Sequence, residues 1–271
     1  MTPSVSVIVA FYNQLDYLRL VLAGFERQSF ESFEIIIADD GSDPRVVQQL
    51  EEIISGSSLR IKHVWHPDKG WRKNRILNKA VQLASSGYLI IIDGDCVPHG
   101  EFVNEHCINR RKNIALTGRR VNLSSKFTSK LTPEFIKSGK LDRNLVPLIV
   151  DGVLGKSFDV EKGFYFKSAF IRSYFNKKKR GLLGCNFSIH KEELLKINGF
   201  DERYEAPSIG EDSDIQFRYE LFGGGIKSLN NIAVQYHLYH EIKPRPQENL
   251  DLFEKIKSEK QYFTPSGIEK G

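Results

Sequence analysis

Several features that mark whole classes of protein are scarce or missing in this sequence. Its 271 residues include only three cysteines, Cys96, Cys107 and Cys185, an odd and scattered set that argues against a disulfide framework or a zinc knuckle and fits a reducing compartment. No apolar run approaches the ~20 residues that span a bilayer. Residues 1–4 lack the basic and apolar regions of a signal peptide. The sequence therefore predicts a cytoplasmic protein, with peripheral contact at the inner face of the cell membrane as an alternative.

Charge of one sign is not concentrated in any large region either. The formal net charge is +5, which favours anionic ligands only weakly. Acidic residues are interspersed with basic ones almost throughout, which argues against the basic face of a nucleic-acid-binding protein. The one clear basic run is Lys177-Lys178-Lys179-Arg180. With 40% apolar and 27% charged residues, the chain has the composition of a globular domain that buries a core.

The first half of the chain alternates short apolar runs with amphipathic segments. Continuous apolar runs predict strands buried on both faces, and segments with one apolar face predict helices. The predicted strands are 5–10, 33–38, 61–65 and 88–92, and the predicted helices are 15–25, 43–54, 71–85 and about 100–112. This order is typical of an α/β fold in which a mostly parallel, Rossmann-like central sheet is flanked by helices.

The second half is less regular. Periodicity is weak over 122–180, which predicts an insertion of loops and short helices. Beyond it we expect a strand at 184–189, helices at 191–196 and from near 211, two short strands within 226–236, and a charged helix at 248–260. In the second of those helices Ile215, Tyr219 and Phe222 have core spacing. We expect a single domain over 1–240, with an insertion at 122–183 and a C-terminal helical extension at 241–271.

Polar residues follow the predicted strands, at the edge where parallel sheets bind their ligands. Asp93-Gly94-Asp95 ends the fourth strand. Two carboxylates around a glycine suit Mg²⁺ or Mn²⁺, which bind through carboxylates plus substrate phosphates and act as Lewis acids. Asp and Gly are also common in solvated turns, so the motif alone favours neither interpretation.

A second acidic motif, Asp39-Asp40-Gly41-Ser42, follows the second strand. Carboxylates there can accept hydrogen bonds from a nucleobase or from ribose hydroxyls. The same stretch suits a helix cap, because Ser42 or Asp43 precedes Pro44. Both interpretations hold together if Ser42 and Asp43 cap the helix while the two aspartates face the ligand.

A third acidic motif, Glu211-Asp212-Ser213-Asp214, opens a predicted helix. One of its carboxylates is a candidate general base for an acceptor hydroxyl. An isolated acidic helix start is more often simple capping, favoured by the helix dipole.

Histidines and cations supply the remaining candidates. In His237-Leu238-Tyr239-His240, two histidines near a strand end are candidates to complete a metal's coordination, although single histidines are more often structural. In residues 70–75, Arg72 and Arg75 lie at a helix start and suit a diphosphate, with a solvated basic face as the alternative.

Together these motifs resemble the inverting family 2 glycosyltransferases of the GT-A fold. The stretch 5–13 looks like the opening strand of that family, Asp39 to Ser42 resembles its nucleoside-binding motif, and Asp93 to Asp95 resembles its DXD motif. The segments 184–188, 198–202 and 210–214 are similar to the C-terminal half of galactosyl- and N-acetylgalactosaminyl-transferases, including bacterial chondroitin-polymerase-like enzymes. The resemblance covers roughly residues 4 to 240, an ordinary domain size.

The resemblance implies a role for each matching residue. It implies that Asp95 binds Mn²⁺ or Mg²⁺, with His240 the preferred further ligand ahead of His237, and that Asp93 contacts the ribose or the metal. It implies that Asp40 binds the base, with Asp39 nearby. The whole donor-binding set that we expect is Phe11, Asn13, Asp39, Asp40, Arg72, Arg75, Asp93 and Gly94.

For the acceptor side, the resemblance implies that Asp212 is the catalytic base and that Glu211 binds the acceptor. It divides the domain into a nucleotide-binding half at 1–121, a variable acceptor or lid segment at 122–183, and a catalytic half at 184–240. One departure stands out. The related galactosyltransferases approach the Glu-Asp pair through a Trp- and Gly-rich segment, where this chain has residues 206–210, Ala-Pro-Ser-Ile-Gly.

The implied reaction transfers a hexose or N-acetylhexosamine from a UDP-sugar to a hydroxyl of a glycan or polyprenyl-pyrophosphate-linked acceptor, with inversion. A nucleotidyltransferase is one alternative, but it needs a Gly-rich basic loop after the first strand, and residues 11–14 are not such a loop. A sugar-nucleotide-binding module without catalysis is the other, and it has no need of Glu211 and Asp212.

Overall fold

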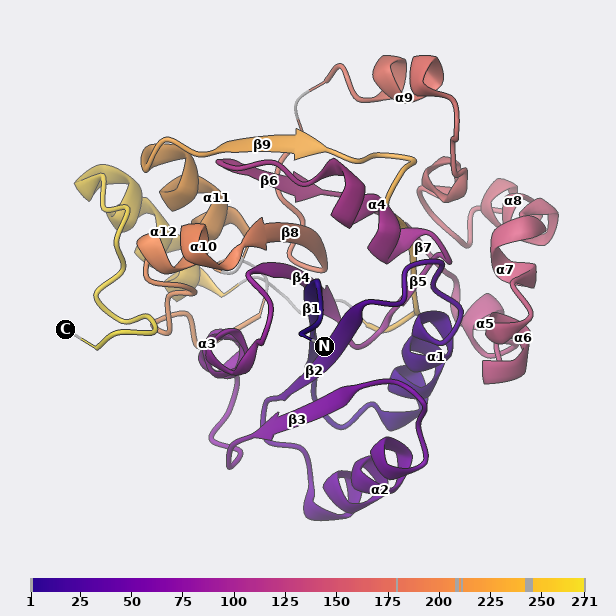
Figure 1. Cartoon of the computed structure of the whole chain (residues 1–271), viewed down its shortest axis with the longest axis horizontal. Helices are drawn as coiled ribbons and strands as arrows, with labels where there is room; N and C mark the ends of the chain where they lie inside the picture. The colour runs from indigo at the N-terminus through magenta and orange to yellow at the C-terminus, as the bar shows by residue number, and fades with distance from the viewer. Residues whose placement is uncertain (1, 179, 208–209, 211, 242–245, 271) are drawn as a thin grey trace.

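A computed structural model describes residues 2–178, 180–207, 210, 212–241 and 246–270. A central sheet crosses the middle of the molecule, with helices on both of its faces (Figure 1). Its seven strands lie in the order β3-β2-β1-β4-β8-β6-β9. They are β1 (Val5–Phe11), β2 (Phe33–Asp39), β3 (Ile61–Trp65), β4 (Tyr88–Asp93), β6 (Ile114–Thr117), β8 (Asn186–His190) and β9 (Gly225–Ser228). Because β8 alone runs against its neighbours β4 and β6, the sheet is mostly parallel, as predicted.

Alternate residues of the central strands face two separate apolar cores. On one face, Val7 and Ile90 pack with α1 (Leu15–Phe25), α2 (Pro44–Ser55) and α4 (Phe102–Asn109). On the other, Ile8 and Ile91 pack with α3 (Lys73–Leu83), α10 (Lys191–Lys196) and α11 (Asp212–Leu221). This alternation explains why the strands read as unbroken apolar runs, since both of their faces are covered.

A second, three-stranded sheet has the order β5-β10-β7, formed by β5 (Cys96–Pro98), β10 (Val234–His237) and β7 (Arg119–Asn122). β10 runs antiparallel to β5 and parallel to β7. Its register places His237 opposite Cys96, directly after the Asp93 to Asp95 motif. β5 and β7 were not predicted, because strands of three and four residues are too short to show a periodicity.

The insertion folds into short helices at the outer margin of the molecule (Figure 1). They are α5 (Ser125–Thr128), α6 (Pro133–Lys137), α7 (Lys140–Arg143), α8 (Val146–Val153), the 3₁₀ helix η1 (Val160–Gly163) and α9 (Ala169–Phe175). The C-terminal extension carries α12 (Gln247–Glu259), close to the predicted bounds. In the part of the chain that is described, no helix is long and apolar enough to cross a bilayer.

Two details differ from the sequence-based predictions. The predicted helix 71–85 is shorter at both ends, and its polar residues Asn74 and Asn78 are buried. The amide of Asn78 donates to the carbonyl of Phe200 at 2.8 Å. The polar face of α3 therefore connects the N-terminal half of the chain to the C-terminal half. Phe222 was predicted to lie in the core but is 40% exposed and packs against the ring of Tyr262, because α11 has already ended at Leu221.

Candidate active site

Parallel pairing brings two of the acidic motifs to one edge of the central sheet. β1 lies between β2 and β4, and its last residues pair with Asp39 on one side and Asp93 on the other. The turn after β4 approaches β1 closely, since the N–H of Gly94 donates to the carbonyl of Ala10 at 2.7 Å. A Cβ at Gly94 would lie 2.9 Å from that oxygen, so this approach requires glycine. The close turn directs the Asp93 to Asp95 motif toward the sheet edge.

Asp95, His237 and His240 form a compact triangle of metal-ligating atoms. Oδ2 of Asp95 lies 3.6 Å from Nε2 of His237 and 3.3 Å from Nε2 of His240, and the two nitrogens are 3.1 Å apart. The pairing of β10 with β5 produces this arrangement, which is locked by a hydrogen bond of 2.8 Å from the Leu238 N–H to the carbonyl of Asp95. The structure thus brings together the three residues that were predicted to hold the metal most directly.

Two of the three groups in this triangle, an ionised Asp95 and a neutral His237, are in the protonation state that binds a cation. Burial raises the pKa of Asp95, but the hydrogen bond from His240 and the charges of both histidines outweigh it and hold that pKa at about 2. Burial lowers the pKa of His237 to about 4, so its ring is neutral at pH 7. The hydrogen bond to Asp95 raises the pKa of His240, whose side chain is about half exposed.

The chemistry of the donor set can also be tested against the predicted metal. The Sγ of Cys96 lies close enough to Asp95 and His237 to join a metal site. Burial raises the pKa of this thiol well above its ordinary value, and the thiol donates to Oδ1 of Asp95 at 3.3 Å, so it remains protonated. One carboxylate and two imidazoles are then left as ligands. This mixed set suits a transition-metal ion better than Mg²⁺, because Mg²⁺ prefers oxygen ligands and keeps several waters.

A lysine partners the other aspartate of the motif. Nζ of the buried Lys73, in the first turn of α3, lies 2.6 Å from Oδ1 of Asp93. Arg72 and Arg75, predicted to bind a diphosphate, lie on either side of Lys73 in the chain. The Arg72 guanidinium donates to the carbonyl of Pro67 at 3.3 Å, and Arg75 is exposed. The starting point of α3 determines that Lys73, rather than either arginine, reaches Asp93.

A second cation, Arg120, lies on β7 beside the same motif. Its guanidinium donates to Sγ of Cys185 at 3.2 Å. Cys185 raises the pKa of Arg120 most strongly, and Asp93 and Asp95 act in the same direction, so the Arg120 charge favours the ionised form of both aspartates. Arg120 was not predicted as a site residue, because it lies in a strand too short to be recognised from the sequence.

Asp39 and Asp40 are held by their own chain. Asp39 is fully buried, and its two oxygens accept from the Ser42 N–H at 2.8 Å and bond His63 at 3.1 Å. Asp40 bonds His66 at 2.8 Å and accepts from the backbone N–H of Arg72 at 2.9 Å. Burial raises the pKa of Asp40, and these bonds oppose that rise. Asp40, one-tenth exposed, is thus better placed than Asp39 to meet a ligand.

The loops after β1 and β2 are tied to each other through Asn13. Its N–H donates to Oγ of Ser42 at 2.8 Å, and its Oδ1 accepts from the N–H of Asp43 at 2.9 Å. Asp43 is the N-cap residue of α2 and precedes Pro44, as predicted, but no capping side chain bonds the first turn of the helix. Asn13 has a left-handed backbone, with a φ of 57°. Phe11 is buried and accepts the N–H of Asp40 through its carbonyl at 2.9 Å, so both residues shape the loop pair.

The candidate base lies at the start of α11. Oδ1 of Asp212 accepts from the N–H of Ser213 at 2.6 Å, and Oδ2 accepts from the N–H of Gly184 at 3.3 Å. Its side chain is partly exposed. The carboxylate therefore lies against the turn that precedes β8. Glu211, which was predicted to bind the acceptor, lies outside the described residues.

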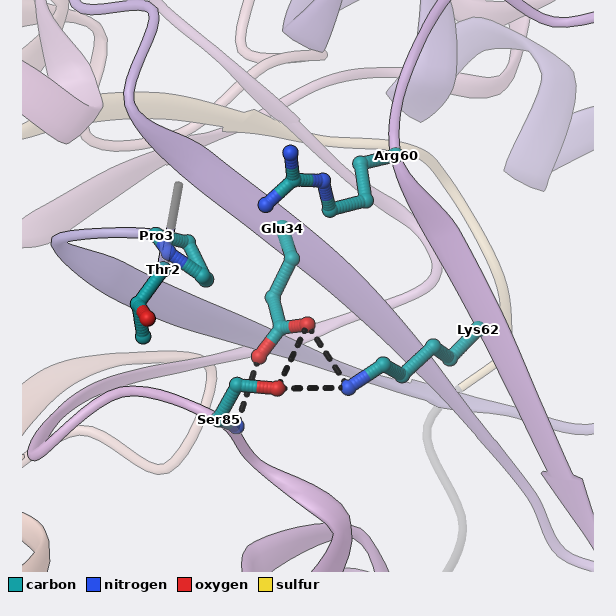
Figure 2. Close-up of a pocket in the computed structure, with 6 residues that line it drawn as sticks. All are labelled: Thr2, Pro3, Glu34, Arg60, Lys62 and Ser85. Carbon is teal, nitrogen blue, oxygen red and sulfur yellow. Dashed lines mark hydrogen bonds and ion pairs between the residues drawn. The ribbon is translucent and has the colours of Figure 1, made fainter.

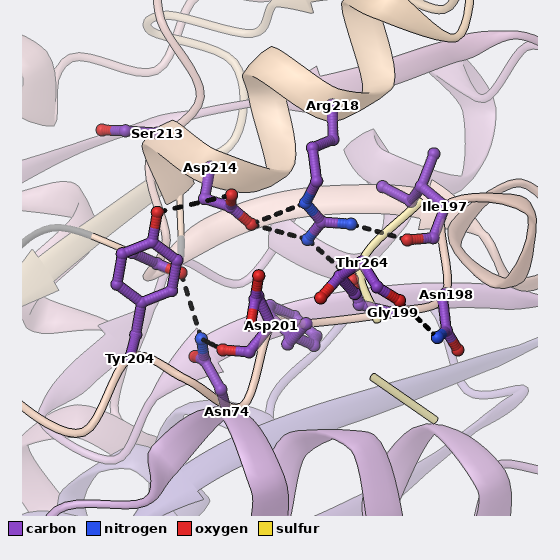
Figure 3. Close-up of polar contacts among 12 residues, drawn as sticks. Asn74, Ile197, Asn198, Gly199, Asp201, Tyr204, Ser213, Asp214, Arg218 and Thr264 are labelled. Carbon is purple, nitrogen blue, oxygen red and sulfur yellow. Dashed lines mark hydrogen bonds and ion pairs between the residues drawn. The ribbon is translucent and has the colours of Figure 1, made fainter. Parts of the chain in front are cut away.

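A buried polar network fixes α11 in place (Figure 3). The fully buried Arg218 pairs with Asp214 at 2.6 Å and donates to the carbonyls of Ile197 and Gly199 at 2.6 and 2.8 Å. From below, the Asn74 amide of α3 donates to the carbonyls of Asp201 and Gly210 at 2.7 and 3.0 Å. The network thus connects the helix that carries Asp212 to the helix that carries Lys73.

The pocket drawn in Figure 2 lies at the opposite, amino-terminal edge of the sheet. Its polar side chains stabilise the fold by bonding one another. Both oxygens of the buried Glu34 are used, by the Ser6 hydroxyl at 2.6 Å, the Ser85 N–H at 2.7 Å and the Lys62 ammonium at 2.9 Å. None of the predicted site residues lines it. The cluster joins the first three strands at the end remote from the acidic motifs.

Comparison with known proteins places the chain in a family. The model of glycosyl transferase family 2 matches residues 6–152, and that of the N-terminal domain of galactosyltransferase matches residues 166–241. The chain belongs to glycosyl transferase family 2, and its class is that of the transferase enzymes. This confirms the family predicted from the motifs.

Two curated relatives make polysaccharides according to their names. The chain is 26% identical to chondroitin synthase of Escherichia coli, over 86% of this chain and 34% of the relative. It is 24% identical to hyaluronan synthase of Pasteurella multocida, over 91% of this chain and 25% of the relative. The chain therefore spans about a third and a quarter of the length of these two relatives.

Solved structures show the fold. TarS of S. aureus matches with a TM-score of 0.54 and 17% identity, over 87% of this chain and 36% of that one. A mannosyltransferase from Pyrobaculum calidifontis, solved with GDP-Man and Mn²⁺, matches with a TM-score of 0.56 and 16% identity, over 89% of this chain and 58% of that one. The predicted GT-A fold is confirmed.

Proposed function

We propose that the chain is a metal-dependent, inverting glycosyltransferase. It moves a hexose or N-acetylhexosamine from a UDP-sugar to a hydroxyl of a glycan or lipid-linked acceptor, in the synthesis of a surface polysaccharide. The observation that carries this proposal is the convergence of Asp95, His237 and His240 next to the Asp93–Lys73 pair. The synthases among its relatives support a polysaccharide product, and the mannosyltransferase complex supports a nucleotide-sugar donor and a divalent cation.

The donor side of the reaction needs positive charge where the diphosphate departs. Asp95 and His240, with His237 and Asp93 beside them, would hold a Mn²⁺ or Mg²⁺ ion, which would supply Lewis acidity to that group. Lys73, in contact with Asp93, offsets the repulsion between that carboxylate and the diphosphate, and Arg120 adds positive charge to the same region. Because these charges are already in place in a partly buried site, they can stabilise the departing diphosphate without rearrangement during the reaction.

The rest of the donor site is proposed on the loops at the sheet edge. Asp40, one-tenth exposed, accepts from the nucleobase or the ribose, while Asp39 and Asn13 hold the loop pair in shape. Phe11 and Gly94 allow the chain to approach the donor closely. Arg72 and Arg75 lie at the start of α3 and attract the diphosphate.

The acceptor side depends on Asp212. Its carboxylate removes the proton from the acceptor hydroxyl as the oxygen attacks the anomeric carbon, and the bond to the UDP oxygen breaks. A single displacement of this kind inverts the anomeric configuration. Glu211 is proposed to bind the acceptor. We propose a cytoplasmic location, where nucleotide-sugars are available.

A nucleotide-sugar screen tests this function. We expect one UDP-sugar to raise the melting temperature in the presence of Mn²⁺, because a ligand that binds only the native state stabilises it. The same donor should be hydrolysed slowly, or transferred to an acceptor glycan. Asp95→Ala and His240→Ala should both abolish the Mn²⁺-dependent part of the stabilisation, whereas Glu51→Ala, an exposed carboxylate on α2, should not change it.

Three outcomes contradict the proposal. Full activity in a chelator would show that the triangle holds no catalytic metal. Stabilisation by a nucleotide-sugar without any turnover, across a panel of acceptors, would favour the binding module instead. Transfer of the nucleotidyl group rather than the sugar would identify a nucleotidyltransferase.

A further inference from the structure

Helix α8 turns an apolar stripe outward. Val146, Val150 and Val153 recur at the spacing of one helix face, and they are 65%, 54% and 83% exposed. Leu148 is the only buried residue of this helix. A surface helix of a globular protein ordinarily shows the reverse, with its apolar stripe on the core and its polar face in water. Core packing therefore does not explain the composition of α8.

Helix α9 shows the same property more strongly. None of its residues is buried, and Phe170 and Tyr174 are 83% and 65% exposed. Ile171 and Phe175 are also exposed. Large apolar side chains gathered in exposed positions mark interaction surfaces. In Figure 1 both helices lie at the outer margin of the molecule, away from the central sheet.

The stretch of sequence that contains α9 carries charged side chains of one sign only. Residues 162–191 contain no aspartate or glutamate, and they carry eight lysines and arginines. Arg172 is paired with Glu105 at 2.5 Å, so it belongs to the fold. Lys167, Lys177 and Lys178 are exposed, and the ammonium of Lys177 lies 5.5 Å from the centre of the Tyr174 ring. Exposed apolar side chains are thus interleaved with exposed cations.

We propose that α8 and α9 form a peripheral membrane-binding surface that docks on a bilayer with anionic headgroups. Basic residues beside aromatic and aliphatic ones are typical of helices that lie in the membrane interface, where the apolar groups enter the acyl boundary and the cations meet lipid phosphates. The absence of acidic residues from 162–191 matches this partner by charge. The surface goes beyond the proposed sugar transfer, because docking requires neither donor nor metal.

Vesicle co-sedimentation tests this surface. We expect the chain to bind vesicles of phosphatidylcholine with phosphatidylglycerol, and to bind pure phosphatidylcholine at least about tenfold more weakly. Val150→Ser with Val153→Ser, and separately Phe170→Ser with Tyr174→Ser, should each lower the partition coefficient about tenfold or more. Lys177→Gln with Lys178→Gln should weaken binding and flatten its dependence on salt. These side chains are exposed, so the melting temperatures should stay unchanged.

A matched control uses exposed apolar residues outside the insertion. Ile108→Ser with Leu221→Ser, which are 63% and 40% exposed, should leave vesicle binding unchanged. Failure of the wild-type chain to bind anionic vesicles would overturn the proposal, and so would equal losses in the control. A concentration-dependent dimer that disappears in the α8 and α9 variants, without vesicle binding, would assign the surface to a second copy of the chain. The Mn²⁺-dependent stabilisation by the UDP-sugar should be unaffected by all of these variants, because the proposed donor site lies outside the insertion, and this separates the proposal from the proposed function.

Discussion

Nζ of Lys73 lies 2.6 Å from Oδ1 of Asp93, joining the first turn of α3 to the end of β4. Both side chains are largely buried, at 11% and 23% exposure. An ion pair so placed is screened less by solvent than a surface pair, so it affects the charge that a bound diphosphate meets. The first prediction follows from this contact.

Lys73→Met should reduce sugar transfer. Without the ammonium, the Asp93 carboxylate repels the departing diphosphate, and we expect kcat to fall about 100-fold, the scale of losing one prepositioned charge donor. Steady-state kinetics with the donor found in the screen measures this. Lys79→Met, further along the same helix, is the control and should retain activity. Equal kcat values for the Lys73 variant and the wild type would remove Lys73 from the mechanism.

Asp212→Asn should separate binding from turnover. The amide keeps the size and, through its oxygen, the hydrogen bond from the Ser213 N–H, but it cannot take a proton, so transfer should fall on the order of 10³-fold. UDP binding, measured by calorimetry, should stay within about twofold, because the base acts on the acceptor. Glu192→Gln, an exposed carboxylate on α10, is the control. An unchanged transfer rate in the Asp212 variant would show that another group is the base.

Arg218→Met should destabilise the fold strongly. The substitution leaves the buried Asp214 carboxylate unpaired and two carbonyls without donors, and breaking a buried pair in this way costs about 3–5 kcal/mol. Urea denaturation measures the loss. Lys255→Met, which breaks a pair at 3.9 Å with both partners exposed, should cost no more than about 1 kcal/mol. Similar losses in the two variants would mean that the network does not hold α11.

Glu34→Gln should reduce stability in a pH-dependent way. Burial raises the pKa of Glu34, but the bonds from Ser6, Lys62 and Ser85 outweigh it, so the net pKa lies below 4.5. A lowered folded-state pKa gives stability that is present above the unfolded pKa and lost as the pH falls through the folded one. We expect the variant to be about 1–3 kcal/mol less stable at pH 7.

The readout is the difference in unfolding free energy between wild type and Glu34→Gln across a pH series. That difference should shrink as the pH falls below about 4.5, where the wild-type carboxylate takes up a proton. A difference that stays constant down to pH 3 would show that the charge of Glu34 contributes nothing. Glu31→Gln, an exposed carboxylate just before β2, should show little effect at any pH.

Much of the first half of the fold could be predicted from the sequence. Strands β1 to β4 and helix α1 match their predicted bounds to within a residue, because buried parallel strands and amphipathic helices have strong periodicities. The strand ends of a parallel sheet meet at one edge, so Asp39 and Asp93 were expected together, and they are. What failed was local detail, such as the side-chain cap of α2 and the start of α3.

The site residues were harder to predict from the sequence than the strands and helices. His237 and His240 were predicted as metal ligands from a resemblance, and the pairing of β10 with β5 is what places them beside Asp95. Lys73 and Arg120 were missed because their roles depend on a helix start and a short strand. When two strands far apart in the chain pair, neither strand's local sequence shows a pattern that identifies its partner.

By itself, the sequence determined the parallel sheet, its covering helices and the position of the acidic motifs at the strand ends, because those depend on apolar spacing along the chain. Only the tertiary structure decided which cation meets Asp93, how Asp95 and the two histidines form a triangle, and which apolar side chains of α8 and α9 remain in solvent. These contacts form between segments that are far apart in the chain. They therefore depend on strand register and on burial, which the local sequence pattern does not show.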